Sequence, residues 1–398
     1  MSVDVYNLAP TLKLLLLALV LLVLPLAWVW WRQPKASFQQ RMHALTWVTL
    51  FLTFDLVMFG AFTRLTDSGL GCPDWPGCYG HASPMGASAA IQDAQTQMPT
   101  GPVTFTKAWI EMIHRYLAML VGGLILLSAL YAWVRRWRGD AHSRVLLPTL
   151  TLVWVCVQGA FGALTVTMKL FPLIVTLHLM GGLTLLCLLV LQIQCQRINE
   201  KRQRINDERQ RLNEKRQRLN DDPLHTPQVR TLHWWLVLVG GVLLVMQVAL
   251  GGWVSTNYAV LACNTFPQCQ GSWWPAMDFA RGFGLWRELG VDVQGEVLSF
   301  QALTAIHYSH RLFAYAVFVY LGGLAWWLRG VSAWQQPVKL LLALLVLQLI
   351  TGLSNVVLDW PLLAAVLHTG GAAALCAVLV WMLAGVRRFS IAPDAPAP

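Results

Sequence analysis

Long hydrophobic runs separated by polar segments fill almost the whole chain. A helix needs about 20 apolar residues to cross a bilayer. Runs long enough to do so cover about 11–31, 45–63, 108–134, 145–167, 172–194, 232–253, 303–328, 338–356 and 361–385. The chain of 398 residues is 56% hydrophobic and only 12% charged, which excludes an ordinary soluble domain. The pattern predicts an all-α polytopic membrane protein.

The first run, 11–31, has two interpretations. It lacks a small-x-small cleavage site, is long enough to span, and is followed at once by Arg32 and Lys35. These features favour an uncleaved helix over a cleaved signal peptide. We therefore expect residues 1–44 to form an accessory N-terminal transmembrane helix and a cytoplasmic loop.

The rest of the chain is predicted to hold two copies of a four-helix unit. Residues 60–80 align with 251–271 without a gap, and this offset of 191 places Cys72, Pro76, Cys78 and Gly80 on Cys263, Pro267, Cys269 and Gly271. Each copy has an even number of spans, so both copies have the same orientation and their symmetry axis follows the membrane normal. The expected fold is two pseudo-symmetric four-helix transmembrane bundles, 45–195 and 231–386, plus the extra N-terminal helix.

A charged segment, 196–230, joins the two copies. It repeats a seven-residue phrase beginning at 198, 205, 212 and 219, with one apolar position per heptad. A coiled-coil seam needs two apolar positions per heptad. The segment is therefore predicted to be a charge-laced helix or a flexible cytoplasmic linker. The tail, 387–398, is expected to be disordered.

The positive charges gather in alternate loops. Although the formal net charge is +10, the long loops 64–107 and 254–302 each contain only two Lys or Arg residues. The positive-inside rule then places the N-terminus and both long loops outside and the C-terminus inside. This distribution argues for the lipid bilayer, and against nucleic acid, as the partner of the basic residues.

Cysteines occur in pairs in the two long loops. Cys72 and Cys78 lie in the first loop, and Cys263 and Cys269 lie in the second. Such pairs fit disulfide bonds in an oxidising compartment. They can be structural staples, or redox-active pairs that pass electrons to a site below, and the sequence leaves both roles open.

Four histidines share one depth in the predicted spans: His114, His178, His310 and His368. Each lies roughly six to nine residues inside its span, or about 10 Å below the outer face. In each half, one histidine is on the second helix and one on the fourth, so two level imidazoles can ligate a haem iron from opposite sides. A hydrogen-bonded core histidine is the alternative for any one of them, and the repetition argues against it. Zinc or non-haem iron would lack further ligands.

Ionisable neighbours distinguish the two halves. Glu111 precedes His114 by three residues, whereas the matching residue in the second half is His307. A buried carboxylate can move a proton or stabilise a developing cation. We therefore expect chemistry in the N-terminal half and a resident electron-transfer haem in the C-terminal half. His310, rather than His307, is the favoured iron ligand because it keeps the His-Arg register of the first half.

Arg115 and Arg311 directly follow two of these histidines. A guanidinium at this depth is a candidate for a bidentate contact with a haem propionate. The alternative is that each side chain snorkels to the membrane surface.

Together these motifs resemble the haem A synthase family over residues 45–385. The resemblance is carried by TRLTDSGL at 63–70, CPDWPGC at 72–78, EMIHR at 111–115, the second cysteine pair, His310-Arg311 and His368. It implies oxidation of the C8 methyl group of haem O to a formyl group, which gives the haem A of terminal cytochrome oxidases. Glu111 would be the catalytic carboxylate. His114 and His178 would hold the substrate haem, and His310 and His368 would ligate a permanent haem B.

The same resemblance implies a location and partners. The cysteine loops point to a bacterial member, hence to the bacterial cytoplasmic membrane with these loops on the periplasmic side. Haem O synthase, cytochrome oxidase assembly factors and an electron-transfer protein are the implied partners. The extra N-terminal helix and the charged linker depart from the family's usual eight-helix pattern.

Two other functions compete with this interpretation. A b-type cytochrome that only relays electrons would carry two resident haem B groups and no modified haem. A haem transporter or chaperone would present haem on a tryptophan-rich outer loop, whereas the 20 tryptophans here are spread along the chain.

Overall fold

The computed structural model describes residues 9–140, 143–216 and 231–386. Within these residues, nine helices are long and apolar enough to cross a membrane, as the hydrophobic pattern predicts. They are α1 (Ala9–Arg32), α2 (Phe38–Leu65), α4 (Phe105–Trp137), α5 (Leu146–Thr167), α6 (Pro172–Arg216), α7 (Thr231–Thr256), α9 (Phe300–Leu328), α10 (Gln335–Val357) and α11 (Leu362–Val386). The multi-pass membrane architecture is therefore confirmed.

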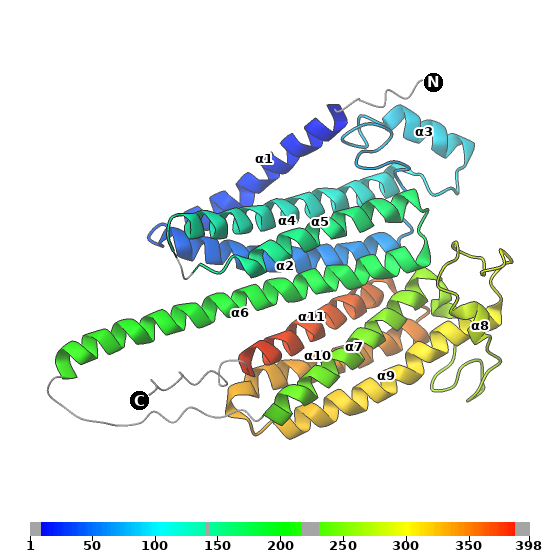
Figure 1. The fold of residues 1–398 in the computed structure, drawn as a ribbon. Coiled ribbons are helices and arrows are strands. Elements are labelled where there is room, and N and C mark those ends of the chain that lie inside the picture. The colour runs from blue at the N-terminus through cyan, green and yellow to red at the C-terminus, as the bar shows by residue number, and fades with distance from the viewer. Residues whose placement is uncertain (1–8, 141–142, 217–230, 387–398) are drawn as a thin grey trace.

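Short elements in the loops were not predicted. The first long loop contains α3 (Ser88–Gln97), and the second contains the 3₁₀ turn η1 (Ala259–Leu261) and α8 (Phe279–Gly282). A further 3₁₀ turn, η2 (Ser332–Trp334), precedes α10. Figure 1 shows α3 and α8 at the same end of the molecule, so both cysteine loops cover one end of the helices.

Side-chain caps set the start of three transmembrane helices. Ser37 and Gln40 form a capping box at α2, with Gln40 Oε1 accepting from Ser37 N at 2.8 Å. Thr104 accepts from Lys107 N at the start of α4, and Ser299 accepts from Ala302 N at the start of α9. These caps satisfy backbone N–H groups that have no partner within the helix.

The helices form two bundles with matching packing. In the first, α2 packs against α4 and α6, and α5 packs against the same two helices; in the second, α7, α9, α10 and α11 take the corresponding places. The halves meet where α2 packs on α11, α6 on α7, and α6 on α11. A pseudo-twofold axis that exchanges the halves turns the contact of α2 with α11 into that of α7 with α6. The same axis maps the contact of α6 with α11 onto itself. Helix α1 lies outside both bundles, against α4 and α2.

Two contacts locate that axis. Arg64 donates to the carbonyl of Ser255, and Tyr258 donates to Asp67 Oδ1 at 2.6 Å. Each contact joins a residue to its own counterpart 191 positions later, which is possible only beside the axis. The axis therefore passes between the C-terminal ends of α2 and α7. Burial raises the pKa of the Tyr258 hydroxyl, which keeps it protonated as a donor.

The outer faces of the helices remain strongly apolar. Leu19 on α1, Val319 on α9 and Leu363 on α11 are 61%, 76% and 72% exposed. In a soluble protein such faces would mark interfaces, but on transmembrane helices they are the surface that lipid covers.

The charged linker begins as a continuation of a transmembrane helix. Helix α6 continues past its hydrophobic span, which ends at Glu200, and runs on to Arg216, which Figure 1 shows as a long extension beyond the bundles. The helical form of the linker is thus confirmed as far as Arg216. Residues 217–230 and the predicted disordered tail, 387–398, lie outside the described residues.

Candidate functional site

The four predicted histidines form two pairs in the structure. His114 on α4 and His178 on α6 lie within electrostatic reach of one another, as do His310 on α9 and His368 on α11. All four imidazoles are half-buried inside their bundles. Each half therefore brings two imidazoles close to one another.

A glycine on the neighbouring helix makes room for each imidazole. The distances from a Cβ built on the glycine to Cε1 of the histidine are 3.0 Å for Gly60 and His114, 3.5 Å for Gly162 and His178, 2.9 Å for Gly251 and His310, and 3.1 Å for Gly352 and His368. At Gly60, Gly251 and Gly352 even an added Cβ would crowd the ring, whereas at Gly162 a Cβ would make an ordinary van der Waals contact with it. Sequence reasoning assigned no role to these glycines, although they repeat at offsets of 191 and 190.

The donor set suits a haem iron better than a bare metal ion. Within the described residues, there is no group of three or more His, Cys, Asp or Glu side chains that could hold a metal ion. Two facing imidazoles can complete the coordination of an iron whose other four ligands come from a macrocycle. In the first half, Nδ1 of His114 and Nδ1 of His178 are buried without a hydrogen-bond partner. The residues present therefore fit a bis-histidine haem.

Glu111 lies at the junction of α4 and the first cysteine loop. Its carboxylate is 4% exposed; Oε2 accepts from the backbone N–H of Cys72 at 2.8 Å, and Oε1 pairs with Arg115. The Arg115 guanidinium also donates to the loop carbonyls of Asp74, at 2.9 Å, and Gly77. The charge of the carboxylate is thus stabilised by the Arg115 cation and by backbone N–H groups of the loop.

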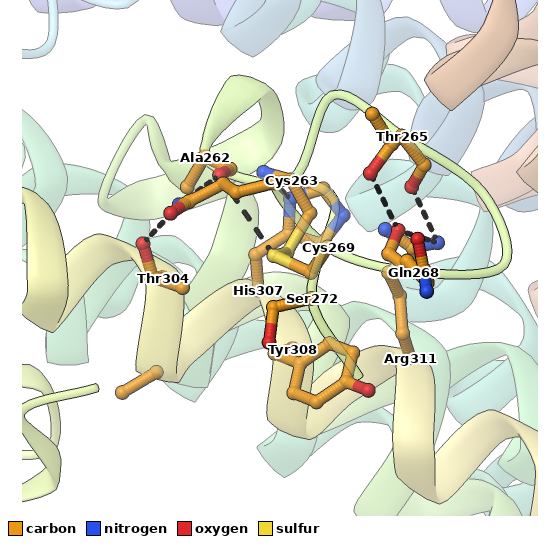
Figure 2. The surroundings of a disulfide bond; sticks show 12 residues. Ala262, Cys263, Thr265, Gln268, Cys269, Ser272, Thr304, His307, Tyr308 and Arg311 are labelled. Atoms are coloured by element: carbon orange, nitrogen blue, oxygen red, sulfur yellow. Dashed lines mark hydrogen bonds between the residues drawn. A yellow bond between two sulfur atoms is a disulfide. The ribbon is translucent and has the colours of Figure 1, made fainter. Parts of the chain in front are cut away.

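The second half repeats this arrangement with a histidine in place of the carboxylate. The N–H of Cys263 points at Nδ1 of His307 at 3.3 Å, and Arg311 donates to the carbonyl of Thr265 at 2.9 Å. Figure 2 shows His307 and Arg311, both from α9, directed at the loop that carries the disulfide. A ring nitrogen of His307 is therefore engaged by the loop, whereas His310 lies within electrostatic reach of His368.

Both cysteine pairs form disulfide bonds, Cys72–Cys78 and Cys263–Cys269, as predicted. Behind each pair the chain turns in a two-residue hairpin, in which Cys78 and His81 exchange backbone hydrogen bonds of 2.8 and 2.9 Å. Such a turn favours positive φ at both central residues. Gly80 and Gly271 occupy this position with φ of 71° and 72°. The repeated glycine of the sequence alignment is therefore a turn residue.

Two polar residues beside the imidazoles were also not predicted from the sequence. Gln247 Nε2 on α7 lies 3.0 Å from Nδ1 of His310, and Thr351 Oγ1 on α10 lies 3.0 Å from Nδ1 of His368. Neither residue belongs to a motif, because only helix packing brings it to a histidine 17 or 63 positions away.

A cavity of about 440 Å³ lies elsewhere, near the start of α2. His43 Nδ1 lies there 2.5 Å from Oε1 of Glu200. His43 precedes Gly60 by 17 helical residues, about 26 Å along α2. This cavity is therefore separate from the histidine pairs.

Fold and site define a class: a helical membrane protein with two internal histidine pairs, each beneath a disulfide-closed loop. The family model of the cytochrome oxidase assembly proteins COX15-CtaA matches residues 43–380, and the chain belongs to this family. It is 37% identical over 339 residues to a protein named Heme A synthase from Shewanella oneidensis, covering 84% of this chain and 94% of that protein. Proteins of the same name from Sinorhizobium medicae and Caulobacter vibrioides are 26% identical, covering 86% and 85% of this chain and 89% and 93% of theirs. The resemblance seen in the motifs is confirmed.

Proposed function

We propose that this protein is a haem A synthase that oxidises the C8 methyl group of haem O to a formyl group. The observation that carries the proposal is Glu111, a buried carboxylate one helical turn from His114. The equivalent residue of the other half is His307, so only one half combines a histidine pair with this acid. Membership of the family supports the same reaction.

The two histidine pairs take different roles in this proposal. His310 and His368 ligate a resident haem B, and His114 and His178 hold the substrate haem. The engagement of His307 with the Cys263 N–H supports His310 as the iron ligand. The two haem groups supply the electron-transfer chemistry when bound.

Glu111 acts on the reacting carbon through charge. A carboxylate beside the methyl carbon would stabilise the positive charge that develops there as electrons leave this carbon for the electron-transfer partner, and would accept the proton released from it. The Cys72 N–H and Arg115 fix the orientation of the acid. The carboxylate is buried beneath the cysteine loop.

The arginines have a second proposed role as propionate partners. Nη1 of Arg311 is buried without a hydrogen-bond partner, although Nη2 of the same group holds the loop. An unsatisfied buried N–H donor is costly, and a propionate oxygen would satisfy it. Arg115 is the equivalent partner in the first half.

The disulfides are proposed to act as staples. Each closes the loop whose carbonyls hold Arg115 or Arg311 and whose N–H contacts Glu111 or His307. Loss of either bond would loosen these contacts. Electron transfer by the cysteine pairs is the competing role.

The remaining proposals concern location and organisation. We place the protein in the bacterial cytoplasmic membrane with the cysteine loops on the periplasmic side. Residues 45–195 form the substrate half and 231–386 the haem B half, with 1–44 as an accessory helix and 196–230 as the linker. Haem O synthase, cytochrome oxidase assembly factors and an electron-transfer protein are the proposed partners.

Mass identification of the bound haems tests the function. The protein is purified after co-expression with a haem O synthase in cells that make no haem A. Haem B together with haem A, or its hydroxylated precursor, is the expected result. Haem B alone, with haem O abundant in the membranes, would instead support an electron-transfer cytochrome. Passage of unmodified haem to an acceptor protein would support a transporter.

Replacing these glycines by leucine should remove the haem from one histidine pair at a time. Gly251→Leu is expected to reduce bound haem B at least about tenfold, because the added side chain takes the space of the His310 ring. Gly60→Leu should reduce retention of the substrate haem and leave haem B in place. The measurement is haem extraction and quantification for each purified variant. Gly122→Leu is the control, since a Cβ there meets nothing within 4 Å; equal haem loss in all three variants would contradict the prediction.

A further inference from the structure

The two histidine pairs differ in what their Nδ1 atoms contact. In the C-terminal half, Nδ1 of His310 lies 3.0 Å from Gln247 Nε2, and Nδ1 of His368 lies 3.0 Å from Thr351 Oγ1. In the N-terminal half, Nδ1 of His114 and of His178 are buried without partners. The helix packing of the two halves is the same, so this difference needs an explanation.

Thr351 selects one tautomer of His368. Its hydroxyl donates its single proton to the carbonyl of Leu347 at 2.8 Å, one turn back in α10. The oxygen is then an acceptor toward Nδ1, so Nδ1 carries the imidazole proton. Nε2 is left with its lone pair, which is the form of histidine that binds iron. Gln348 Nε2 also donates to the carbonyl of His368 at 2.8 Å and fixes the backbone at this point.

Gln247 offers a similar partner to His310. Its Nε2 lies close to Nδ1 and donates to the carbonyl of His310 at 3.2 Å, while its Oε1 is buried without a partner. In this orientation the amide presents its N–H donor to Nδ1; a half-turn would present Oε1 to Nδ1 as an acceptor, in exchange for the hydrogen bond from Nε2 to the His310 carbonyl. The buried, unsatisfied Oε1 is thus the atom that a ligating His310, protonated on Nδ1, requires.

The N-terminal half has apolar residues at the equivalent positions. Leu56 stands 191 positions before Gln247, and Phe161 stands 190 positions before Thr351. These offsets are the ones that relate Gly60 to Gly251 and Gly162 to Gly352. Neither a leucine nor a phenylalanine side chain can accept a proton from an imidazole, so the first pair lacks side-chain anchors at these two positions.

We infer that Thr351 and Gln247 are positioning residues that anchor the ligands of the resident haem, and that Phe161 and Leu56 leave the other pair free to exchange its haem. This inference rests on the proposed assignment of haem B to the C-terminal half. A hydrogen bond from Nδ1 orients an imidazole and raises its basicity as a ligand, and its loss typically weakens metal binding 10–100-fold. A substrate site gains from the opposite property, because its haem has to leave after each turnover.

Removal of the two anchors tests the inference on the full-length protein with haem B bound. Thr351→Val and Gln247→Leu are each expected to speed transfer of haem B to apomyoglobin at least about tenfold. The reduction potential of the C-terminal haem should also become more positive, because a less basic imidazole stabilises ferric iron less. Phe161→Thr should slow release of the N-terminal haem, a change that mere loss of packing would not produce.

Thr151→Val is the matched control. Thr151 is buried on α5 and donates to the carbonyl of Leu147 at 2.8 Å, as Thr351 does to Leu347. Its variant should keep wild-type transfer and potential. If both anchor variants hold haem B as the wild type does, at unchanged potential, this inference is overturned while the proposed function stands. If the wild-type protein makes haem A but substitutions of Thr351 and of His368 leave bound haem B unaffected, the assignment of haem B to His310 and His368 is wrong as well.

Discussion

Glu111→Gln is expected to lower the rate of haem A formation by about 10²–10⁴-fold, the usual contribution of a positioned acid or base. The amide keeps the size of the carboxylate and can still accept from the Cys72 N–H. It has no negative charge to oppose positive charge at the methyl carbon and no basic oxygen to take a proton. Haem B content should be unchanged, because the C-terminal pair is untouched. Turnover is measured as haem A formed from haem O in membranes, with bound haems quantified in the same samples.

The control for Glu111 is its counterpart in the other half. His307→Gln occupies the matching site below a disulfide loop, where His307 contacts the Cys263 N–H. This variant should convert haem O within a few-fold of the wild-type rate. If the two variants were equally impaired, the acid would be acting only as a loop anchor. If Glu111→Gln retained full activity, the catalytic proposal would be wrong.

Alanine substitution of the histidines should separate the two haem sites. His310→Ala and His368→Ala are expected to lower bound haem B to less than about a tenth of the wild-type content, because each removes one of two axial ligands. His114→Ala and His178→Ala should retain haem B but lose the substrate haem to a similar extent. The reason is that each pair lies within its own bundle, so loss of one ligand leaves the other site complete. Absorption spectra and haem extraction from each purified variant give both quantities.

His307→Ala distinguishes the two neighbouring histidines of α9. His307 is 4% exposed and engaged by the cysteine loop, so its removal should leave haem B bound. Loss of haem B from His307→Ala, together with its retention in His310→Ala, would reverse the ligand assignment. Loss of haem B from His114→Ala would show instead that the halves do not bind haem independently.

The sequence alone was enough to determine the transmembrane architecture and the internal repeat. A bilayer requires about 20 apolar residues per spanning helix, so the hydrophobic pattern alone predicts the spans. The cysteine pairs were equally readable, because Cys72 and Cys78 are close in the chain and recur at one offset as Cys263 and Cys269. Glu111 and the histidines were also prominent, since ionisable groups in apolar runs are rare.

Only the tertiary structure decided how these groups are held. Arg115 and Arg311 both hold loop carbonyls, 41 and 46 positions away, and no local pattern encodes such a contact. The glycines that admit the imidazoles, and the anchors Gln247 and Thr351, come from neighbouring helices. Periodicity specifies that a helix crosses the membrane but not which side chains of two helices meet. That choice depends on helix packing, which is why the repeat was visible in the sequence while the difference between its two histidine pairs appeared only in three dimensions.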